Sequence, residues 1–286
     1  MKIAVLTDST SIIDPQIKRK LNIKVLPLPL LVNGKTYYEK YYHDYVELKN
    51  DLGKSQCFLS AGQVSVEALQ EIVDDLIEKG YTDVICVHID DSISGLGSNL
   101  RSFAIKQRNK INIHLVDSYS FGIIEGKLTQ LVGEWVAAGE DWQTIKPKIL
   151  QARNKMHTLV IMKNLKHIST TGYIKNGVSS VEKTLLNPKT LLRFGQDGCL
   201  EVTNTFSQYG RLFKEVRREI APAYQEMAGD LKISIMMIQN KRNQQIVSKL
   251  ITLLNRVYPV AKIDMHEMPL SMIAHIGEQS IVISWN

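Results

Sequence analysis

Three acidic residues, each followed by a serine, come directly after apolar segments in the first half of the chain. They form the pairs Asp8-Ser9, Asp91-Ser92 and Asp117-Ser118. If the apolar segments are strands of one parallel sheet, their carboxyl ends meet at one edge, where such sheets bind ligands. The pairs therefore predict a hydroxyl-lined site at that edge. The alternative for any single pair is that the aspartate and serine only cap the following helix.

The loop from Ser92 to Ser98 is a second candidate, because it contains two glycines and three serines. Small residues let backbone N–H groups approach an anion, and the helix that follows presents its positive end. The loop could therefore hold a carboxylate or a phosphate. No Gly-Lys-Ser or Gly-Lys-Thr follows it and the dinucleotide-binding spacing is incomplete, so neither of those nucleotide sites is predicted. A plain strand-to-helix turn is the alternative.

The elements that must position these residues alternate as in a parallel sheet covered by helices. Strands are expected at Lys2 to Thr7, Asp83 to Ile89 and Ile111 to Val116. A helix over Val66 to Lys79 has one apolar stripe and ends before a glycine suited to a C-cap. The stretch Ile23 to Tyr38 contains two prolines and an Asn-Gly pair, which predicts a hairpin inserted into this pattern.

The second half of the chain mixes strands and helices less regularly. The chain has 286 residues, of which 44% are hydrophobic, so two domains are expected. We predict an α/β fold: an N-terminal parallel-sheet α/β domain over residues 1–155, with a small hairpin insert at about 23–55, and a C-terminal α+β domain over residues 156–286. One very large domain is the alternative.

Composition argues against several functional classes. The net charge is +6, but its lysines and arginines are scattered, so solvated helix faces explain them better than a nucleic-acid surface. No segment has eighteen uninterrupted apolar residues, and we expect no stable membrane insertion. The cysteines, Cys57, Cys86 and Cys199, are far apart and odd in number. We therefore expect a cytoplasmic protein without a bound metal or other cofactor.

Five segments match, in order and spacing, the motifs of one known family. They are Asp8-Ser9-Thr10, Ala61-Gly62-Gln63-Val64-Ser65, Ile93-Ser94-Gly95-Leu96, His114-Leu115-Val116-Asp117-Ser118 and His275-Ile276-Gly277-Glu278-Gln279. In these segments the chain resembles the DegV family of bacterial proteins. These proteins bind fatty acids, and they include the lipid-presenting subunits of a two-component fatty acid kinase. The landmarks cover essentially the whole chain.

The resemblance implies a non-catalytic protein that sequesters a long-chain fatty acid, or a similar single-chain lipid, at the interface of the two domains. The carboxyl group would be held by the first domain and presented to a fatty acid kinase subunit, and the tail would be buried in the second. The residues expected to bind the ligand are Ser94 and Gly95 at the head group, Ser65 and Gln63 at the pocket wall, His275 near the carboxylate, and Gly62 and Ser9.

Some positions depart from the family pattern. Ala61 and Gly62 replace a Thr-Ser pair, Leu96 replaces a threonine, and two basic residues correspond to Tyr173 and Ser207. Each lost charge-assisted hydrogen bond would weaken carboxylate binding by roughly tenfold or more, since such a bond contributes about 1.5–3 kcal/mol. Burial of the tail, at about 0.8 kcal/mol per CH₂, would still supply affinity. Lipid binding is therefore expected to survive these changes.

Three further interpretations stay open. Methionines at positions 236, 237, 265, 268 and 272 suit an adaptable acyl tunnel, or an ordinary core. A degenerate family member without lipid, acting as a regulatory or partner-binding protein, is the main alternative function. A hydrolase or phosphotransferase using the Asp-Ser loops is another, although the chain has no Gly-x-Ser-x-Gly or HExxH motif.

Overall fold

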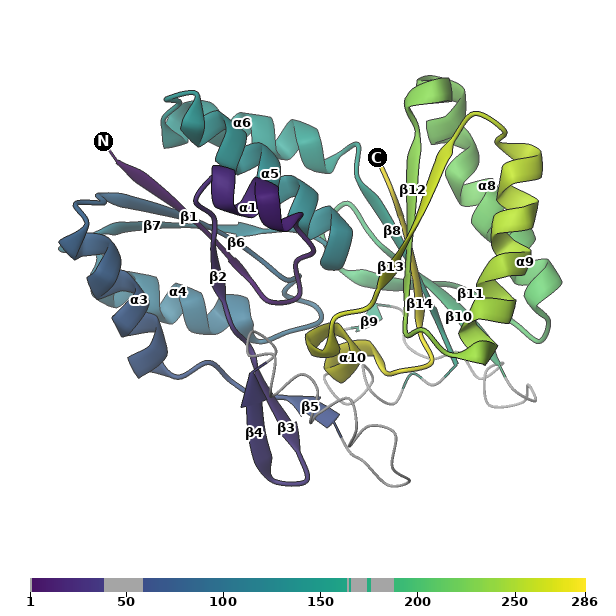
Figure 1. The fold of residues 1–286 in the computed structure, drawn as a ribbon, viewed down its shortest axis with the longest axis horizontal. Coiled ribbons are helices and arrows are strands. Elements are labelled where there is room, and N and C mark those ends of the chain that lie inside the picture. The colour runs from purple at the N-terminus through teal and green to yellow at the C-terminus, as the bar shows by residue number, and fades with distance from the viewer. Residues whose placement is uncertain (1, 39–58, 164, 166–173, 176–187) are drawn as a thin grey trace. The chain divides into compact units, whose positions relative to one another are not determined.

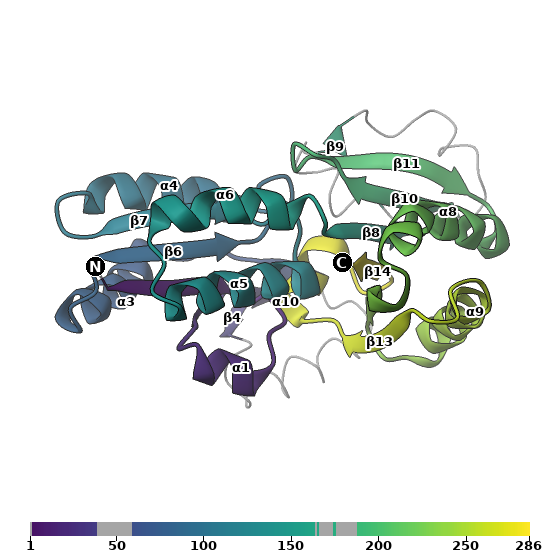
Figure 2. The same cartoon turned by 90° about the horizontal axis from the view of Figure 1, so that it is seen from above.

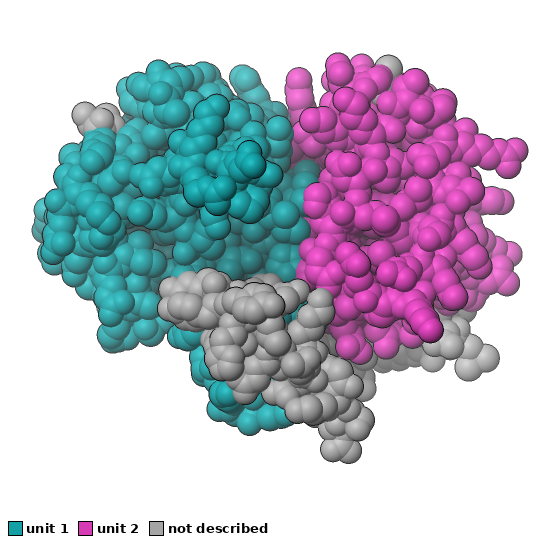
Figure 3. Space-filling model, in the orientation of Figure 1, with its two compact units in different colours: residues 1–154, 269–275 teal, residues 155–268, 276–286 magenta. Residues whose placement is uncertain are grey.

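The computed structural model describes residues 2–38, 59–163, 165, 174–175 and 188–286. The chain forms two compact units, coloured separately in Figure 3. Unit 1 comprises residues 1–154 and 269–275, and unit 2 comprises residues 155–268 and 276–286. Unit 1 therefore contains a short segment that follows most of unit 2 in the sequence.

Unit 1 contains a four-stranded sheet whose strand pairs are all parallel. In spatial order its strands are β2 (Lys24–Leu26), β1 (Ile3–Asp8), β6 (Asp83–His88) and β7 (Asn112–Asp117). Every residue of β6 is buried, as expected for a central strand covered on both faces. The predicted parallel sheet is confirmed.

Helices cover both faces of this sheet, with α5 and α6 on one side and α3 and α4 on the other (Figure 1). The helices of unit 1 are α1 (Pro15–Lys20), α3 (Val66–Glu78), α4 (Leu96–Gln107), α5 (Gly122–Ala137) and α6 (Trp142–Arg153). The apolar stripe of α3 buries Leu69, Val73 and Leu76. This is the helix that the spacing of apolar residues predicts, and Gly80 follows it with a φ of 76°.

A small antiparallel sheet of unit 1 contains the predicted hairpin. Its strands are β4 (Lys35–Tyr38), β3 (Pro29–Val32) and β5 (Leu59–Ala61), in that order. Asn33 and Gly34 join β3 to β4 and both have positive φ, which two-residue hairpin turns require. The hairpin begins later than Ile23, because Lys24–Leu26 pairs with β1 and belongs to the parallel sheet. Residues 39–55 of the predicted insert lie outside the described residues.

Unit 2 is built on a seven-stranded sheet of mixed direction. The strands, in spatial order, are β13 (Lys262–Glu267), β12 (Lys232–Met237), β14 (Ile281–Trp285), β8 (His157–Met162), β10 (Lys189–Phe194), β11 (Leu200–Phe206) and β9 (Ile174–Lys175). The pairs β12–β13 and β11–β9 are parallel and the other pairs are antiparallel. This arrangement agrees with the predicted α+β class.

Two long helices of unit 2, α8 (Tyr209–Met227) and α9 (Lys241–Val257), pack against one face of the sheet (Figure 2). Alternate strand residues such as Leu159 and Ile161 join the helices in a continuous apolar core. The intervening residues, including Val160 and Met162, are also buried, so both faces of the central strands are apolar. A short 3₁₀ helix, η1 (Ala228–Asp230), follows α8.

A helix that spans a bilayer needs roughly 20 predominantly apolar residues. No helix in the described ranges is long and apolar enough to cross a membrane.

Candidate functional site

The carboxyl ends of three parallel strands meet at one edge of the unit 1 sheet. β1 ends at Asp8, β6 at His88 and β7 at Asp117, and the registers place Thr7 beside Val87 and His88 beside Asp117. The structure thus confirms that the strands preceding the Asp-Ser pairs end at the same edge of one parallel sheet. All three pairs lie within or directly after this edge.

The aspartates at this edge bind backbone N–H groups of neighbouring loops. Asp8 Oδ2 accepts a hydrogen bond from Ile89 N (2.8 Å), and Asp117 Oδ2 accepts one from Asp91 N (3.2 Å). For Asp8 and Asp117, the alternative that they only cap the following helices is wrong, since these partners follow the adjacent strand. Their function in the fold is to join the loops across the edge. The Asp91 carboxylate instead pairs with Arg101 of the following helix α4, 2.7 Å away.

Burial changes the acidity of this edge. Burial, followed by repulsion from Asp117, raises the pKa of Asp90 to about 8, although Ser92 N donates a hydrogen bond of 2.7 Å to its carboxyl group. Burial also raises the pKa of Asp117. Arg153 lies over the Tyr119 ring, 3.9 Å from its centroid, and donates to the Asp117 carbonyl. In the part of the chain that the structure describes, no three His, Cys, Asp or Glu side chains are placed to hold a metal ion.

Glu125 of α5 is a residue of this edge that the motifs do not reveal. Its side chain is completely buried and accepts a hydrogen bond from Thr7 Oγ1 (3.1 Å). Burial, followed by the charge of Asp8, raises its pKa well above the usual range. The sequence signal for this residue is an acidic side chain between the apolar residues Ile124 and Leu128. Both of these neighbours are buried in the structure.

The glycine-containing loop leads into α4 at the same edge. Gly95 is the N-cap of α4 and is exposed, and a Cβ added to it would meet nothing within 4 Å. Ser94 is partly exposed, and its Oγ accepts a hydrogen bond from Leu96 N (3.3 Å). Gly97 differs, because a Cβ there would lie 1.9 Å from Asp91 Oδ1. The loop thus has open space at Gly95 and tight packing at Gly97.

The residues expected at the pocket wall lie between β5 and α3. Ser65 caps α3 by accepting a hydrogen bond from Ala68 N (3.2 Å), and both Ser65 and Gln63 are exposed. Gly62 N donates to the carbonyl of Pro29 (2.8 Å), so this segment is joined to the small sheet. Capping accounts for Ser65 structurally, and a ligand contact by these residues stays a prediction.

The chain returns to unit 1 through α10 (Leu270–Ile276), which carries His275. Ser271 Oγ donates to the carbonyl of Ser9 (3.0 Å), and Ser9 Oγ accepts a hydrogen bond from Leu28 N (3.0 Å). The structure therefore brings α10 to the turn after β1, which joins two predicted site segments separated by more than 250 residues.

His275 has an uncompensated polar atom. Its Nε2 is buried and has no hydrogen-bond partner among the described residues, although the residue as a whole is partly exposed. Burial lowers its pKa to about 4, against the opposing effect of the Asp8 charge. The ring is therefore neutral near pH 7. An orphaned buried nitrogen indicates a missing partner, such as a ligand oxygen.

A buried lysine of unit 2 contacts the backbone at Ser207. Lys189 is buried, and its Nζ donates to the carbonyl of Ser207 (2.7 Å). A lysine ammonium therefore lies beside the backbone of Ser207, the position at which the family resemblance implies a basic residue. Residues 171–173, including Tyr173, lie outside the described residues.

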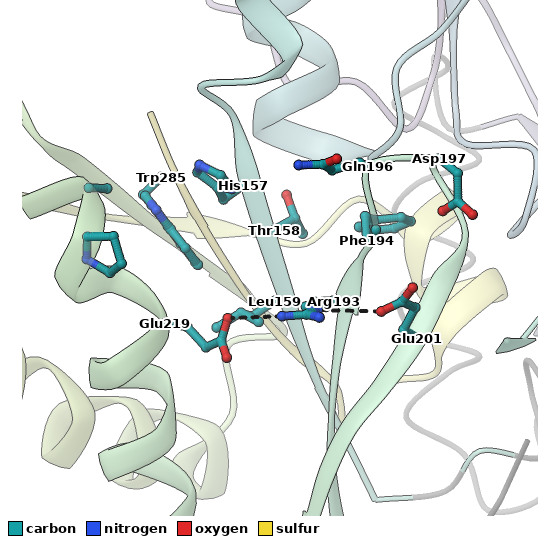
Figure 4. Close-up of a pocket in the computed structure, with 13 residues that line it drawn as sticks. His157, Thr158, Leu159, Arg193, Phe194, Gln196, Asp197, Glu201, Glu219 and Trp285 are labelled. Carbon is teal, nitrogen blue, oxygen red and sulfur yellow. Dashed lines mark ion pairs between the residues drawn. The ribbon is translucent and has the colours of Figure 1, made fainter. Parts of the chain in front are cut away.

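A separate pocket of about 650 Å³ lies at one end of the unit 2 sheet (Figure 4). Arg193 faces two acidic side chains in it, with Nε 3.5 Å from Glu201 Oε2 and a terminal nitrogen 3.8 Å from Glu219 Oε2. His157 and Trp285 stack with ring centroids 5.3 Å apart. Because two carboxylates offset one guanidinium, this pocket is poorly suited to a carboxylate ligand.

The five methionines considered for an acyl tunnel do not form one group. Met237 belongs to the core beneath α8 and α9, whereas Met236 is buried on the opposite face of the same strand. Met265 is 60% exposed, and Met272 belongs to unit 1. A tunnel lined by all five is therefore excluded.

These features define a class: an α/β protein with a polar, acid-containing edge on a parallel-sheet unit and a mixed-sheet unit with an apolar core. The chain belongs to the DegV family, because the family model described as "Uncharacterised protein, DegV family" matches residues 2–286.

Relatives and solved structures agree with this assignment. A DegV domain-containing protein of Staphylococcus aureus is 31% identical over 200 residues, which cover 69% of this chain and 68% of the relative. One of Streptococcus pyogenes is 25% identical over 84% of this chain and 83% of the relative.

Among solved structures, a fatty acid binding DegV family protein of Streptococcus agalactiae has a TM-score of 0.81 at 22% identity, covering 100% of this chain and 98% of that one. A DegV family protein of Eubacterium eligens, loaded with heptadecanoic acid, has a TM-score of 0.75 at 15% identity, covering 99% and 98%. These likenesses show the fold.

Proposed function

We propose that this protein binds a fatty acid, or a similar single-chain lipid, without catalysing a reaction. The observation that carries the proposal is the buried, unpartnered Nε2 of His275, on a helix with which the chain returns to unit 1. A neutral imidazole with a free ring nitrogen can hydrogen-bond a carboxyl oxygen. The heptadecanoic acid with which the Eubacterium eligens protein is loaded supports an acyl ligand.

The carboxyl group is proposed to lie at the carboxyl edge of the unit 1 sheet. Ser94 and Gly95 would contribute a hydroxyl and backbone N–H groups, and the absence of atoms within 4 Å of a Gly95 Cβ leaves room there. His275 and Ser9 would complete the contacts on the α10 side. Gly62, Gln63 and Ser65 would line the wall next to β5.

The acyl tail is proposed to pack on unit 2, on the sheet face that α8 and α9 do not cover. Buried apolar residues of this face include Val160, Met162, Leu192, Met236 and Val282, none of which belongs to the core beneath the two helices. All five are 0% exposed, so the tail would have to displace groups that already cover them. Burying each CH₂ there would contribute about 0.8 kcal/mol. The tail would therefore supply most of the affinity.

The finer parts of the proposal concern location and partner. We infer that the protein works in the cytoplasm and presents the bound carboxyl group to a fatty acid kinase, as the family resemblance implies. The experiment is to add a candidate kinase and ATP to lipid-loaded protein and to measure acyl phosphate. If no kinase of the source bacterium forms acyl phosphate with the loaded protein, the proposed kinase partner is wrong. The protein would then still be proposed as a lipid carrier.

Lipid extraction tests the central claim. Protein purified from cytoplasmic expression should release a single-chain acid or related lipid that mass spectrometry identifies, at about one molecule per chain. Repeatedly empty protein that also fails to bind a fluorescent fatty acid would overturn the proposal and favour a lipid-free regulatory protein.

His275→Ala tests the head-group contact. Loss of one hydrogen bond to a charged group, about 1.5–3 kcal/mol, should weaken fatty acid binding roughly tenfold or more. Binding of the corresponding methyl ester should change less, because it lacks the charge. An equal loss for both ligands would mean that His275 acts on the tail or on folding.

A further inference from the structure

The contacts of Glu125 require an additional proton. Thr10 Oγ1 lies 2.7 Å from Glu125 Oε2 and 2.6 Å from Asp8 Oδ1. One hydroxyl has one proton and can donate to only one of these carboxyl groups. If both acids were ionised, the second carboxylate oxygen would then lie against the Thr10 oxygen with no hydrogen between them. One of the two acids must therefore be protonated.

The remaining hydrogen bonds indicate which acid carries that proton. Asp8 accepts bonds from two backbone N–H groups, Thr10 N to Oδ1 (2.9 Å) and Ile89 N to Oδ2 (2.8 Å), which favour its ionised form. Glu125 accepts a side-chain bond from the hydroxyl of Thr7. Burial raises the pKa of Glu125. The consistent arrangement is Glu125 donating to Thr10, and Thr10 donating to Asp8.

This chain of hydrogen bonds ends at the candidate site. The Asp8 carboxylate holds Ile89, which precedes the loop carrying Ser94, through the 2.8 Å bond to its backbone N–H. The residue after Asp8 is Ser9, whose carbonyl receives the Ser271 hydroxyl of α10 (3.0 Å). Both segments proposed to contact the carboxyl group are thus attached to the turn that Glu125 and Thr10 support.

We propose that Glu125 is a positioning residue of the acyl site: as a neutral acid it fixes Thr10 and Asp8, which hold the Ser94 loop and α10 in place. The lipid-binding experiments described below rest on the proposed function. The measurement of the Glu125 proton is independent of that function. The titratable groups that act on Glu125 are Asp8 on β1 and Cys86 on β6, whereas α6, also packed on α5, buries Ile145 and Ile149.

Infrared difference spectroscopy tests the proton directly. At neutral pH the wild-type protein should show the C=O stretch of a buried carboxylic acid that disappears in Glu125→Gln. Asp90→Asn serves as the control, because it removes a different buried acid and should leave that band in place. Absence of a Glu125-dependent band would overturn the inference whether or not the protein binds lipid.

Binding of a fluorescent fatty acid tests the positioning. A glutamine can still accept from Thr7 and donate to Thr10, so Glu125→Gln should bind within about threefold of wild type, whereas Glu125→Ala should bind roughly tenfold more weakly. Thr10→Val should resemble Glu125→Ala, and Thr10→Ser should retain binding. Thermal unfolding checks that each variant folds. If Glu125→Ala does not fold, the difference in affinity between Thr10→Ser and Thr10→Val tests the positioning.

The pH profile separates positioning from simple packing. Ionisation of Glu125 at high pH would place a second charge beside Asp8, so wild-type affinity should fall in alkaline solution. Glu125→Gln cannot ionise and should keep its affinity over the same range. Identical pH profiles, or equal losses in the Gln and Ala variants, would contradict the inference while leaving lipid binding itself intact.

Discussion

In unit 1 the carboxyl groups of Asp8, Asp90 and Glu125 are buried, whereas the described part of unit 2 buries no acidic side chain. Unit 2 instead packs two helices on a hydrocarbon core that includes Leu159, Ile235 and Leu250. Burying an ionisable group costs several kcal/mol unless hydrogen bonds compensate it. Unit 1 makes this compensation at both ends of its parallel sheet, because Asp83 at the start of β6 is also buried and its Oδ1 lies 2.9 Å from His114 Nε2. The carboxyl edge gathers the larger group of buried acids, which the described part of unit 2 lacks.

The largest effect should follow from placing a carboxylate in unit 2. Leu250→Asp puts a charge at a completely buried position of α9, where no described network is available to compensate it. We expect a loss of about 4–5 kcal/mol or complete unfolding of this unit. Urea denaturation measures it, with Leu250→Met, expected to cost less than about 1.5 kcal/mol, as the control. A stable Leu250→Asp protein would remove the contrast between the units.

A smaller effect should come from a close approach within unit 1. A Cβ at Gly126 would lie 1.9 Å from the carbonyl oxygen of Ile12, so α5 must shift away from that backbone in Gly126→Ala. We expect a destabilisation of about 3 kcal/mol. Gly210→Ala is the matched control in α8, because a Cβ there meets nothing within 4 Å and alanine favours the helix. Equal unfolding midpoints for the two variants would contradict the packing at Gly126.

The pH dependence of stability should report the buried acids of unit 1. The pKa of Asp90 is about 8 in the folded protein and 3.8 for an unperturbed aspartate, so between these values the folded state binds more protons. Asp90 should therefore lower stability as pH rises from about 4 to about 8, contributing a slope of at most about 1.4 kcal/mol per pH unit. Asp90→Asn should remove this contribution, so the stability of the variant should fall less steeply over the same window.

Chemical denaturation at several pH values measures this slope. Asp141→Asn is a suitable control, because Asp141 is an exposed helix cap with a lowered pKa and does not titrate in that window. A wild-type stability that rises through the window would show that Asp90 is ionised throughout.

The smallest effect is expected for the unit 2 pocket. Arg193 is 49% exposed and its two ion pairs are long, at 3.5 and 3.8 Å, so Arg193→Ala should cost less than about 1 kcal/mol. Fatty acid affinity should not change, because the ligand is proposed to lie elsewhere. Weaker binding in Arg193→Ala, measured by fluorescence titration, would move part of the site into this pocket.

The sequence was sufficient to predict the regular elements. Apolar runs located β1, β6 and β7 to within a residue or two. The signal was clearest for β6, because a strand covered on both faces must be apolar throughout. The stripe of α3 and its capping residues were equally informative, since helix periodicity is local. The Asn33-Gly34 turn was predictable for the same reason.

The site was less predictable because its contacts are not local. Nothing in the spacing of α10 indicated that it would leave unit 2 and contact Ser9. Lys189 comes to lie beside Ser207 only through the pairing of β10 with β11, which places Lys189 opposite Phe206. Glu125 gave a weak signal, as an acid among apolar helix residues, but its partners come from β1 (Thr7) and from the turn after it (Thr10).

The return of α10 to unit 1 has a consequence for synthesis. A ribosome emits roughly 5–20 residues per second, and N-terminal domains commonly fold while the rest is still being made. Unit 1 cannot do so completely, because residues 269–275 belong to it. The sheet edge at which α10 contacts Ser9 is complete only after residues 269–275 have emerged. A chain truncated before residue 269 would lack the α10 contact at this edge, so a complete edge indicates that unit 2 has been synthesised at least to residue 268.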